Sequence, residues 1–162
     1  MELNKKMNRM GPVIFALADI KGKHMLDIIY KQTTPNLEGY KNLYSSTGWK
    51  YKYPVTEENL RTALENTWVW ICAYHEENLV GIGRLISDGA LYAFVCDLIV
   101  LPKYQNMKIG SSILKRLKQI CVDKQIKRVW LFAATDRAAF YEQRGFEVRP
   151  SNMPGMQLSD NC

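Results

Sequence analysis

The sequence contains few of the residues that hold metals or form disulfides. It has only two histidines, His24 and His75, and its four cysteines form no Cys-x-x-Cys pair. Metal sites built from these side chains need closer spacings, so we expect no metal. The cysteines at positions 72, 96 and 121 lie inside apolar segments, which is typical of buried thiols and of a reducing compartment such as the cytoplasm.

The sequence also lacks an apolar run long enough to cross a membrane, so we expect no membrane partner. Residues 12–18 follow three basic residues and faintly outline a secretory signal, but this apolar run is short and opens with Pro12. We therefore do not expect export. Residues 1–25 are interpreted as an N-terminal extension, either an added strand or short helix on the domain or a start-site extension.

No run of basic residues is interleaved with aromatic ones. The formal net charge of +6 allows a polyanion as partner, but without such a run a basic nucleic-acid-binding domain is only an alternative interpretation. The same charge suits a protein that binds a multiply phosphorylated small molecule. With 162 residues, 47% of them hydrophobic, the chain can bury a core without disulfides. We predict a single domain over residues 26–162.

Apolar periodicity predicts an α/β (α+β) fold, with a mixed, mostly antiparallel central sheet flanked by about four helices. The expected strands are residues 26–31, 68–74, 79–86, 91–101, 129–134, 146–149 and 156–158. The expected helices are residues 35–45, residues 56–66 with Thr56 as N-cap, a helix from Ile109, and a short one that Thr135 or Asp136 caps and Gly145 ends. The long crossover makes strand 129–134 parallel to strand 91–101.

The stretch from Asp97 to Lys118 organises the rest of the chain. Residues 91–101 are continuously apolar except for Asp97, which predicts a fully buried strand that Pro102 stops. A polar loop, residues 103–108, leads into the helix that starts at Ile109. The first amides of a helix have no partner inside it, and such amides bind anions, most often phosphate. By itself this arrangement also fits an ordinary crossover connection.

Four motifs occur in the order in which one known family carries them. The loop is similar to the acyl-CoA loop of the GNAT superfamily of N-acetyltransferases, Gln/Arg-x-x-Gly-x-Gly/Ala, with Gln105 at the first position and Gly110 at the sixth. Lys108 departs from the glycine that the family has at the fourth. The run F-Y-E-Q-R-G-F, residues 140–146, resembles the C-terminal signature of the family. Together with N-L-V-G-I-G-R-L (78–85) and D-L-I-V-L-P (97–102), the match covers residues 26–158 and implies the three-layer GNAT fold.

The resemblance implies an acyltransferase (EC 2.3.1.-) that moves an acetyl group from acetyl-CoA to a primary amine by direct attack in a ternary complex. Tyr141 matches the family tyrosine that stands near the sulfur and can protonate the leaving thiolate, as a phenol with a pKa of roughly 10 is suited to do. The family pattern places the cofactor on backbone amides of the central strand and on the loop and helix start. In this chain these residues are Leu98, Ile99, Val100, Gln105, Asn106, Met107, Lys108, Ile109, Gly110 and Ser111.

Asp97 is a candidate for the path of the amine's proton. A carboxylate inside a buried strand is unfavourable unless it is paired or functional, and burial would raise its pKa toward that of a usable base. Alternatively, Asp97 bonds neighbouring backbone or pairs with Arg84, and a chain of waters carries the proton. Asp88 is a weaker candidate, and no activating base marks Cys96 as a nucleophile.

We expect a small-molecule or peptide amine as the acceptor, and the resemblance allows a homodimer, since dimers are frequent in the family. Residues 45–54 hold three aromatic residues, which form either a cover for the core or a wall of the acceptor site that recognises amines by cation–π contact. Lys108 motivates a second interpretation, a CoA-binding sensor or interaction module of the GNAT fold without turnover.

Overall fold

A computed structural model describes residues 26–49 and 54–158 of the chain. The N-terminal extension expected for residues 1–25, Tyr51 and Tyr53 of the aromatic loop, and Cys162 lie outside the described residues. The chain forms two compact units, one that ends at Leu131 and one that begins at Phe132. The prediction of a single domain over residues 26–162 stays a prediction.

Five strands of the larger unit form one sheet with the order β1-β2-β3-β4-β5. The strands are β1 (Ile28–Lys31), β2 (Val69–His75), β3 (Asn78–Ser87), β4 (Tyr92–Val100) and β5 (Arg128–Trp130). All neighbours are antiparallel except β4 and β5, which run parallel as the long crossover predicted. The α+β class and the mixed, mostly antiparallel sheet are therefore confirmed.

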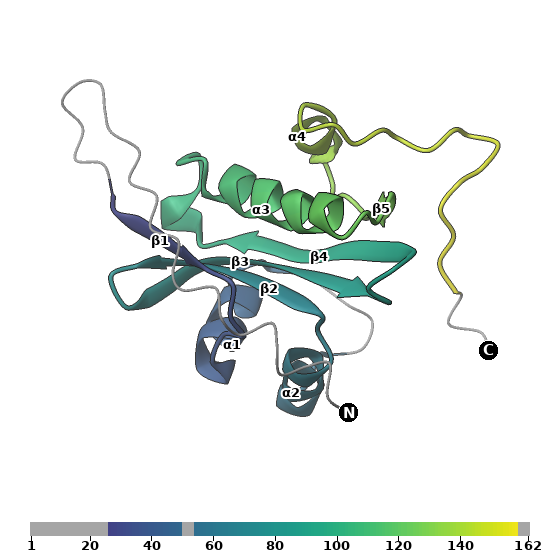
Figure 1. Cartoon of the computed structure of the whole chain (residues 1–162). Helices are drawn as coiled ribbons and strands as arrows, with labels where there is room; N and C mark the ends of the chain where they lie inside the picture. The colour runs from purple at the N-terminus through teal and green to yellow at the C-terminus, as the bar shows by residue number, and fades with distance from the viewer. Residues whose placement is uncertain (1–25, 50–53, 159–162) are drawn as a thin grey trace, which may run out of the picture. The chain divides into compact units, whose positions relative to one another are not determined.

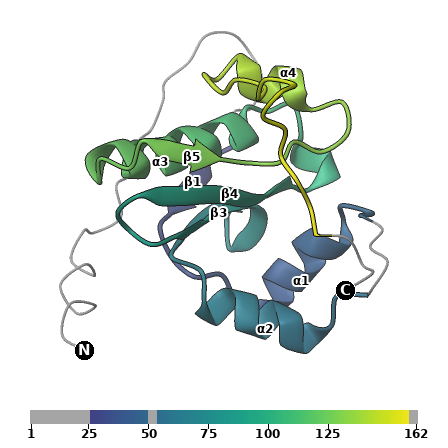
Figure 2. The same ribbon diagram turned by 90° about the vertical axis from the view of Figure 1, so that its right-hand side faces the viewer.

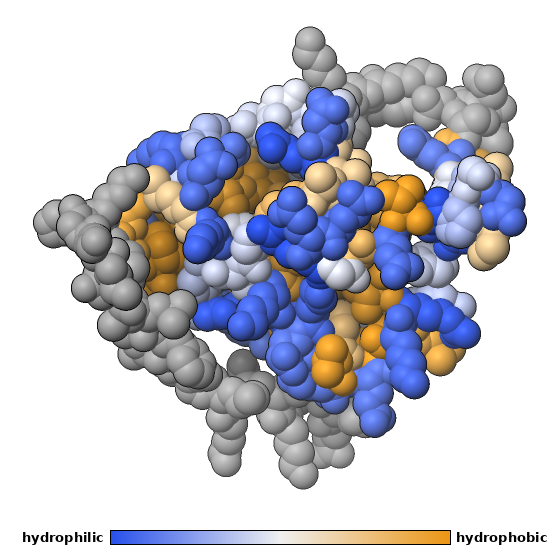
Figure 3. Space-filling view, turned by 90° about the horizontal axis from the view of Figure 1, so that it is seen from above, coloured by the Kyte–Doolittle hydropathy of each residue, from blue (hydrophilic) through white to orange (hydrophobic). Residues whose placement is uncertain are grey.

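Helices cover both faces of this sheet, so the larger unit has three layers. Figures 1 and 2 show α1 (Leu37–Ser45) and α2 (Glu57–Glu65) on one face and α3 (Ile109–Asp123) on the other. Tyr40 and Leu43 of α1 pack with Trp70, Ile82 and further buried residues into the core of the first face. On the α3 side, seen from above in Figure 3, hydrophilic side chains alternate with hydrophobic areas.

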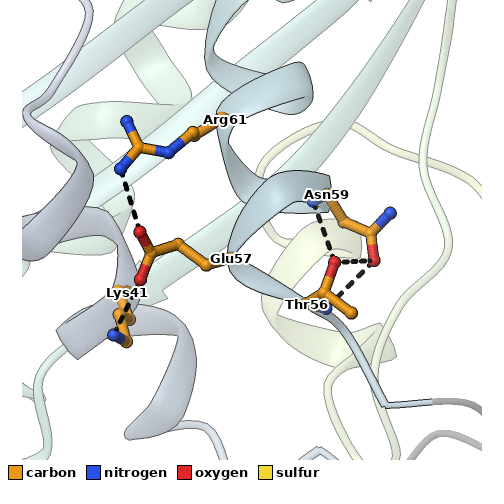
Figure 4. A network of polar contacts seen from close by, with 5 residues as sticks. All are labelled: Lys41, Thr56, Glu57, Asn59 and Arg61. Atoms are coloured by element: carbon orange, nitrogen blue, oxygen red, sulfur yellow. Dashed lines mark hydrogen bonds and ion pairs between the residues drawn. The ribbon is translucent and has the colours of Figure 1, made fainter.

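The two helices on the first face begin at side-chain caps. Thr56 accepts from the backbone of Asn59, whose side chain binds the backbone of Thr56 in return, and this capping box confirms the predicted start of α2 (Figure 4). Glu57 then bridges Lys41 of α1 and Arg61 of α2. Helix α1 begins after Asn36, which accepts from the backbone N–H of the residue three positions on.

Two glycines bring α3 against β3. A Cβ atom on Gly83 would lie 2.7 Å from Cγ2 of Ile113 and 3.0 Å from Cδ1 of Leu117, and one on Gly81 would lie 3.2 Å from Cγ2 of Ile109. Real Cβ atoms do not approach other atoms as closely as the first of these distances. The glycines of the N-L-V-G-I-G-R-L motif therefore let the helix that follows the loop lie directly on the sheet.

Strand β4 is not fully buried, contrary to what its continuous apolar run predicts. Its burial alternates: Ala93, Val95 and Ile99 are buried, whereas Tyr92 is 44% exposed. Leu91, the first residue of the predicted run, precedes the strand and is 57% exposed. The residues between the buried ones, Phe94, Cys96, Leu98 and Val100, are half-buried, so composition overstated the burial.

In its described residues, 132–158, the smaller unit contains one short helix, α4 (Ala138–Glu142). Its N-cap is Arg137, which makes no side-chain cap bond, so Thr135 and Asp136 do not cap it as predicted. Gly145 has φ +83° and ends the turn after the helix, as a C-terminal glycine should. The predicted strands 146–149 and 156–158 are wrong, because these residues form no ladder and Met156 is 85% exposed. Strand β5 likewise ends at Trp130 instead of residue 134.

Candidate active site

Strand β4 carries a bulge at the middle of the predicted site. Ile82 pairs with Ile99 and Arg84 pairs with Cys96, so Asp97 and Leu98 together stand opposite Gly83. Asp97 has φ +47°, a left-handed conformation that few residues other than glycine, asparagine and aspartate adopt. One extra residue in β4 thus bends the strand where the sequence placed the catalytic centre.

The pairing between β4 and β5 ends at Phe94, before the bulge at Asp97 and Leu98. The parallel pairing spans Tyr92 to Phe94, and no described strand continues it toward Val100. The N–H of Leu101 donates to the carbonyl of Val80 in β3 at 3.0 Å. Because N–H directions alternate along a strand, the amides of Leu98 and Val100 point away from β3, and that of Ile99 points toward it. Of the three predicted amide donors, two therefore face the side that β5 leaves open.

Two residues in left-handed conformation shape the loop between β4 and α3. A short 3₁₀-helix, η2 (Pro102–Tyr104), is followed by Asn106 with φ +63° and Lys108 with φ +61°. Gln105 donates from its side-chain Nε2 to the carbonyl of Val100 at 3.0 Å, and its backbone N–H donates to the carbonyl of Pro102. Gln105 therefore ties the loop to the end of the strand, and its own amide is used within the loop.

Helix α3 starts at the predicted residue and carries no side-chain cap. Lys108 is its N-cap, and the first helical bond runs from the N–H of Ser112 to the carbonyl of Lys108. The amides of Ile109 and Gly110 precede that bond. Ile109 is 2% exposed and packs its side chain inward, whereas Gly110 is half-buried and Lys108 is exposed. The positive end of a 15-residue helix, with no acidic residue in its first turn and a lysine beside it, favours an anion.

Asp97 lies in a cluster of polar side chains. Its Oδ2 atom accepts from the hydroxyl of Tyr40 at 2.6 Å and from Nε of Arg84 at 2.7 Å. The Arg84 and Asp97 side chains are 15% and 12% exposed. Arg84 also donates to Oγ1 of Thr67 at 3.0 Å and lies 5.6 Å from the ring of Trp70. The structure thus places Asp97 in the pair with Arg84 that the sequence allowed, and its role in proton transfer stays a prediction.

The cluster changes how its members ionise. Burial and the neighbouring Asp97 charge raise the pKa of Tyr40 far above its usual value. Burial is the largest influence on Arg84 and would lower its pKa, but the charge and hydrogen bond of Asp97, together with the neighbouring Tyr40 and Cys96, outweigh burial and the pKa is raised. Tyr40 therefore stays neutral and Arg84 stays charged at any physiological pH. Burial also raises the pKa of the Cys96 thiol, which fits the expectation that it is no nucleophile.

Tyr141 lies in the smaller unit, on α4. Its ring makes edge contacts with Phe140 and Phe146, at centroid distances of 5.0 Å and 6.0 Å. Its carbonyl accepts from the N–H of Phe146 at 3.1 Å. Burial raises the pKa of Tyr141, and Arg137 opposes the rise in part. The phenol is therefore protonated at neutral pH, as a proton donor has to be.

A hollow of the larger unit is lined by none of the predicted catalytic or cofactor-binding residues. It has a volume of about 620 Å³ and lies between α1, the turn after β2 and the start of the loop, where Glu38, Lys41, Glu77 and Lys103 are among its lining residues. In the described part of the chain, no group of three or more His, Cys, Asp or Glu side chains could hold a metal. Nor is any helix among those residues long and apolar enough to cross a membrane.

Sequence reasoning missed Tyr40 and Thr67. Tyr40 belongs to the apolar face of α1, and its hydroxyl meets Asp97 from 57 residues away in the chain. No local pattern marks such a tyrosine, because its ring packs like any core aromatic residue. Arg84 was named only as one possible partner of Asp97. Gln105 was expected to bind a ligand, and its contact with Val100 gives it a structural role as well.

A model of the acetyltransferase (GNAT) family matches residues 34–146. The chain is 29% identical over 134 residues to the uncharacterized N-acetyltransferase ycf52 of Pyropia yezoensis, a match that covers 79% of this chain and 75% of that protein. It is 31% identical over 104 residues to the chloroplastic serotonin N-acetyltransferase 2 of Oryza sativa subsp. japonica, covering 62% of this chain and 52% of that protein. Among solved structures, a GNAT-family acetyltransferase from Streptococcus pneumoniae superposes with a TM-score of 0.71 and 33% identity, over 83% of this chain and 98% of that chain.

Proposed function

The chain belongs to the GNAT family of acetyltransferases, and on this premise we propose that it transfers the acetyl group of acetyl-CoA to a primary amine. Acetyl-CoA would supply the activated thioester, and the amine would attack it directly in a ternary complex. The observation that carries the proposal is the bulge in β4, which turns the amides of Leu98 and Val100 to the side that β5 leaves open. Donors on that side can stabilise an oxyanion.

The residues around the loop fit the diphosphate of such a cosubstrate. The amides of Ile109 and Gly110 precede the first bond of α3, and Gly110 has no Cβ to keep a ligand away. Lys108 adds a cation at the same end of the helix. We propose that Gln105, Asn106, Met107 and Ser111 complete the contact surface. For Gln105 the side chain would shape the loop, because its amide already bonds Pro102.

Proton transfers complete the proposed reaction. The attacking amine must lose a proton and the leaving thiolate must gain one. We assign the second step to Tyr141, which its F-Y-E-Q-R-G-F motif and its neutral phenol support. For the first step, the amine's proton leaves either through a chain of waters or to the Asp97 carboxylate.

The acceptor is proposed to be a small-molecule or peptide amine. One relative is named a serotonin N-acetyltransferase, which makes arylalkylamines one class to test. Trp49, which is 38% exposed, meets the ring of Tyr44 edge-on at 5.7 Å, so part of the aromatic loop lies against α1. Its role as acceptor wall stays a prediction. The cytoplasm also stays a prediction, since the rice relative is a chloroplast protein.

An acceptor screen tests the proposal. Purified protein is incubated with acetyl-CoA and a panel of small amines, arylalkylamines, amino-acid derivatives, aminoglycosides and peptides, and released thiol is measured. We expect thiol release that requires both the protein and an amine. Binding of acetyl-CoA is measured separately by calorimetry, and no heat of binding at millimolar acetyl-CoA would contradict the proposal.

Two other functions give different results in the same experiments. A CoA-binding module without turnover, which the left-handed Lys108 in place of glycine motivates, binds acetyl-CoA but releases no thiol with any amine. A basic nucleic-acid-binding domain shows affinity for DNA or RNA that falls steeply with salt and survives the loss of Tyr141. Absence of such affinity at low salt excludes it.

A further inference from the structure

The carboxylate of Asp97 joins several segments of the larger unit at one point. Tyr40 reaches it from α1 and Arg84 from β3, and both hydrogen bonds end on the same oxygen, Oδ2. Arg84 continues to Thr67, whose hydroxyl donates to the carbonyl of Ala63 at the end of α2 at 2.6 Å. The two helices of one face are thereby connected to a single backbone position in β4.

That position is the bulge residue. Asp97 is held at φ +47°, whereas an unconstrained residue in a strand prefers an extended backbone. If Asp97 relaxed to the extended form, β4 would lose its extra residue. With the residues before Asp97 held in place, the part of β4 after Asp97 would then shift its pairing with β3 by one residue. A shift of one residue reverses which amides face which side. The amides of Leu98 and Val100 would then turn toward β3.

We propose that Tyr40 and Arg84 are positioning residues, which hold Asp97 in its left-handed conformation and so keep the amides of Leu98 and Val100 directed away from β3. The role in catalysis rests on the proposed function, because it matters only if these amides contact the thioester. Neither side chain needs to touch a substrate. Burial strengthens the hydrogen bond between Arg84 and Asp97. The two side chains are only 15% and 12% exposed, so water screens this charge-assisted bond little.

The backbone conformation at residue 97 can be measured without any ligand. Backbone ¹³Cα and ¹³Cβ chemical shifts distinguish a left-handed residue from an extended one, so they report the bulge directly. In Tyr40→Phe and Arg84→Met we expect the shifts of residues 97 and 98 to move toward extended values. The matched controls are Tyr92→Phe and Arg61→Met, because Arg61 also pairs with a carboxylate, Glu57, but on the surface. Unchanged shifts in both test variants would overturn the proposal.

Kinetics test the consequence for the reaction. We expect kcat to fall about tenfold in Tyr40→Phe and about a hundredfold in Arg84→Met, because complete loss of one oxyanion donor costs about a hundredfold to a thousandfold in kcat and misdirection costs less. KM for acetyl-CoA should change little. Glycine adopts positive φ without assistance, so adding Asp97→Gly to Arg84→Met should restore most of the lost kcat. A double variant that is no faster than Arg84→Met would contradict the positioning role.

Asp97→Asn separates positioning from proton transfer. Asparagine tolerates the left-handed conformation and still accepts a hydrogen bond, so a positioning role predicts a kcat within about threefold of the original and an unchanged pH profile. A general base predicts a loss of about a hundredfold or more. If the unaltered protein binds acetyl-CoA but acetylates nothing, the proposed function fails, and the chemical shifts still decide whether Tyr40 and Arg84 hold the bulge.

Discussion

Gly83 of β3 and Ile113 of α3 lie in contact with no room for a Cβ atom between them, since one built on Gly83 would be 2.7 Å from Cγ2 of Ile113. Gly83 is also the residue that faces the bulge of β4. One glycine thus sets how close the helix that follows the loop lies to the strand that carries the predicted amide donors.

Gly83→Ala should destabilise the fold and weaken acetyl-CoA binding. Ile113 and Leu117 are completely buried, so neither can turn aside, and overpacking of this kind costs about 1–3 kcal/mol. Because α3 must move outward, its first amides move with it. Urea unfolding and calorimetry with acetyl-CoA measure the two effects. Gly81→Ala is the control and should have a smaller effect, because its Cβ would come no closer than 3.2 Å to other atoms. Equal effects of the two variants would refute overpacking against Ile113 as the cause.

Lys108→Gly should raise stability. A non-glycine residue at φ +61° costs about 1–2 kcal/mol, and glycine loses part of this gain through its flexible unfolded state, so we expect a net increase of about 0.5–1 kcal/mol. Acetyl-CoA affinity then shows whether backbone approach or the lysine charge dominates, because the first tightens binding in the variant and the second weakens it. Lys124→Gly, at the other end of α3 with φ −89°, removes a cation without relieving strain and should not gain stability.

Tyr141→Phe should lower kcat by one to two orders of magnitude and leave acetyl-CoA binding nearly intact, as expected for loss of a general acid. The pKa of Tyr141 is raised by burial, so the original enzyme should keep its acid protonated beyond pH 10. A pH profile of kcat, recorded for both proteins, checks this. Tyr30→Phe is the control, because it removes a tyrosine hydroxyl elsewhere in the chain. If Tyr141→Phe turned over as fast as the original protein, Tyr141 would have no part in the mechanism.

Stability should fall as the solution becomes alkaline, starting near pH 9. Burial raises the pKa of Cys72 to about 12, and the pKa of Tyr40 is raised strongly as well. In the unfolded chain these groups ionise at their ordinary values, so above pH 9 unfolding releases protons and becomes easier. The stability that the neutral Cys72 and Tyr40 contribute is fully present below their pKa values in the unfolded chain and declines as the pH rises above those values. Urea midpoints between pH 7 and 10.5 measure the slope, which Cys72→Ala should reduce, and an equally steep slope in that variant would contradict the assignment.

The sequence by itself determined the elements and their order. Helix periodicity from Ile109, the cap at Thr56 and the turns between strands are local signals, because they depend on residues a few positions apart. The same kind of signal failed in the smaller unit, where residues 146–149 and 156–158 look like strands in the sequence but form no strand in the structure. A strand needs a partner, and the chain's local composition does not supply one.

The tertiary structure alone decided the geometry of the site. The bulge at Asp97 arises from the register between β3 and β4, and no residue within a few positions of Asp97 specifies that register. Tyr40 meets the same carboxylate from another helix, so its hydroxyl acquires a role only when the layers pack. Local sequence fixes which residues are helical or extended, whereas the direction of a backbone amide depends on contacts between distant segments, and only the folded chain makes those contacts.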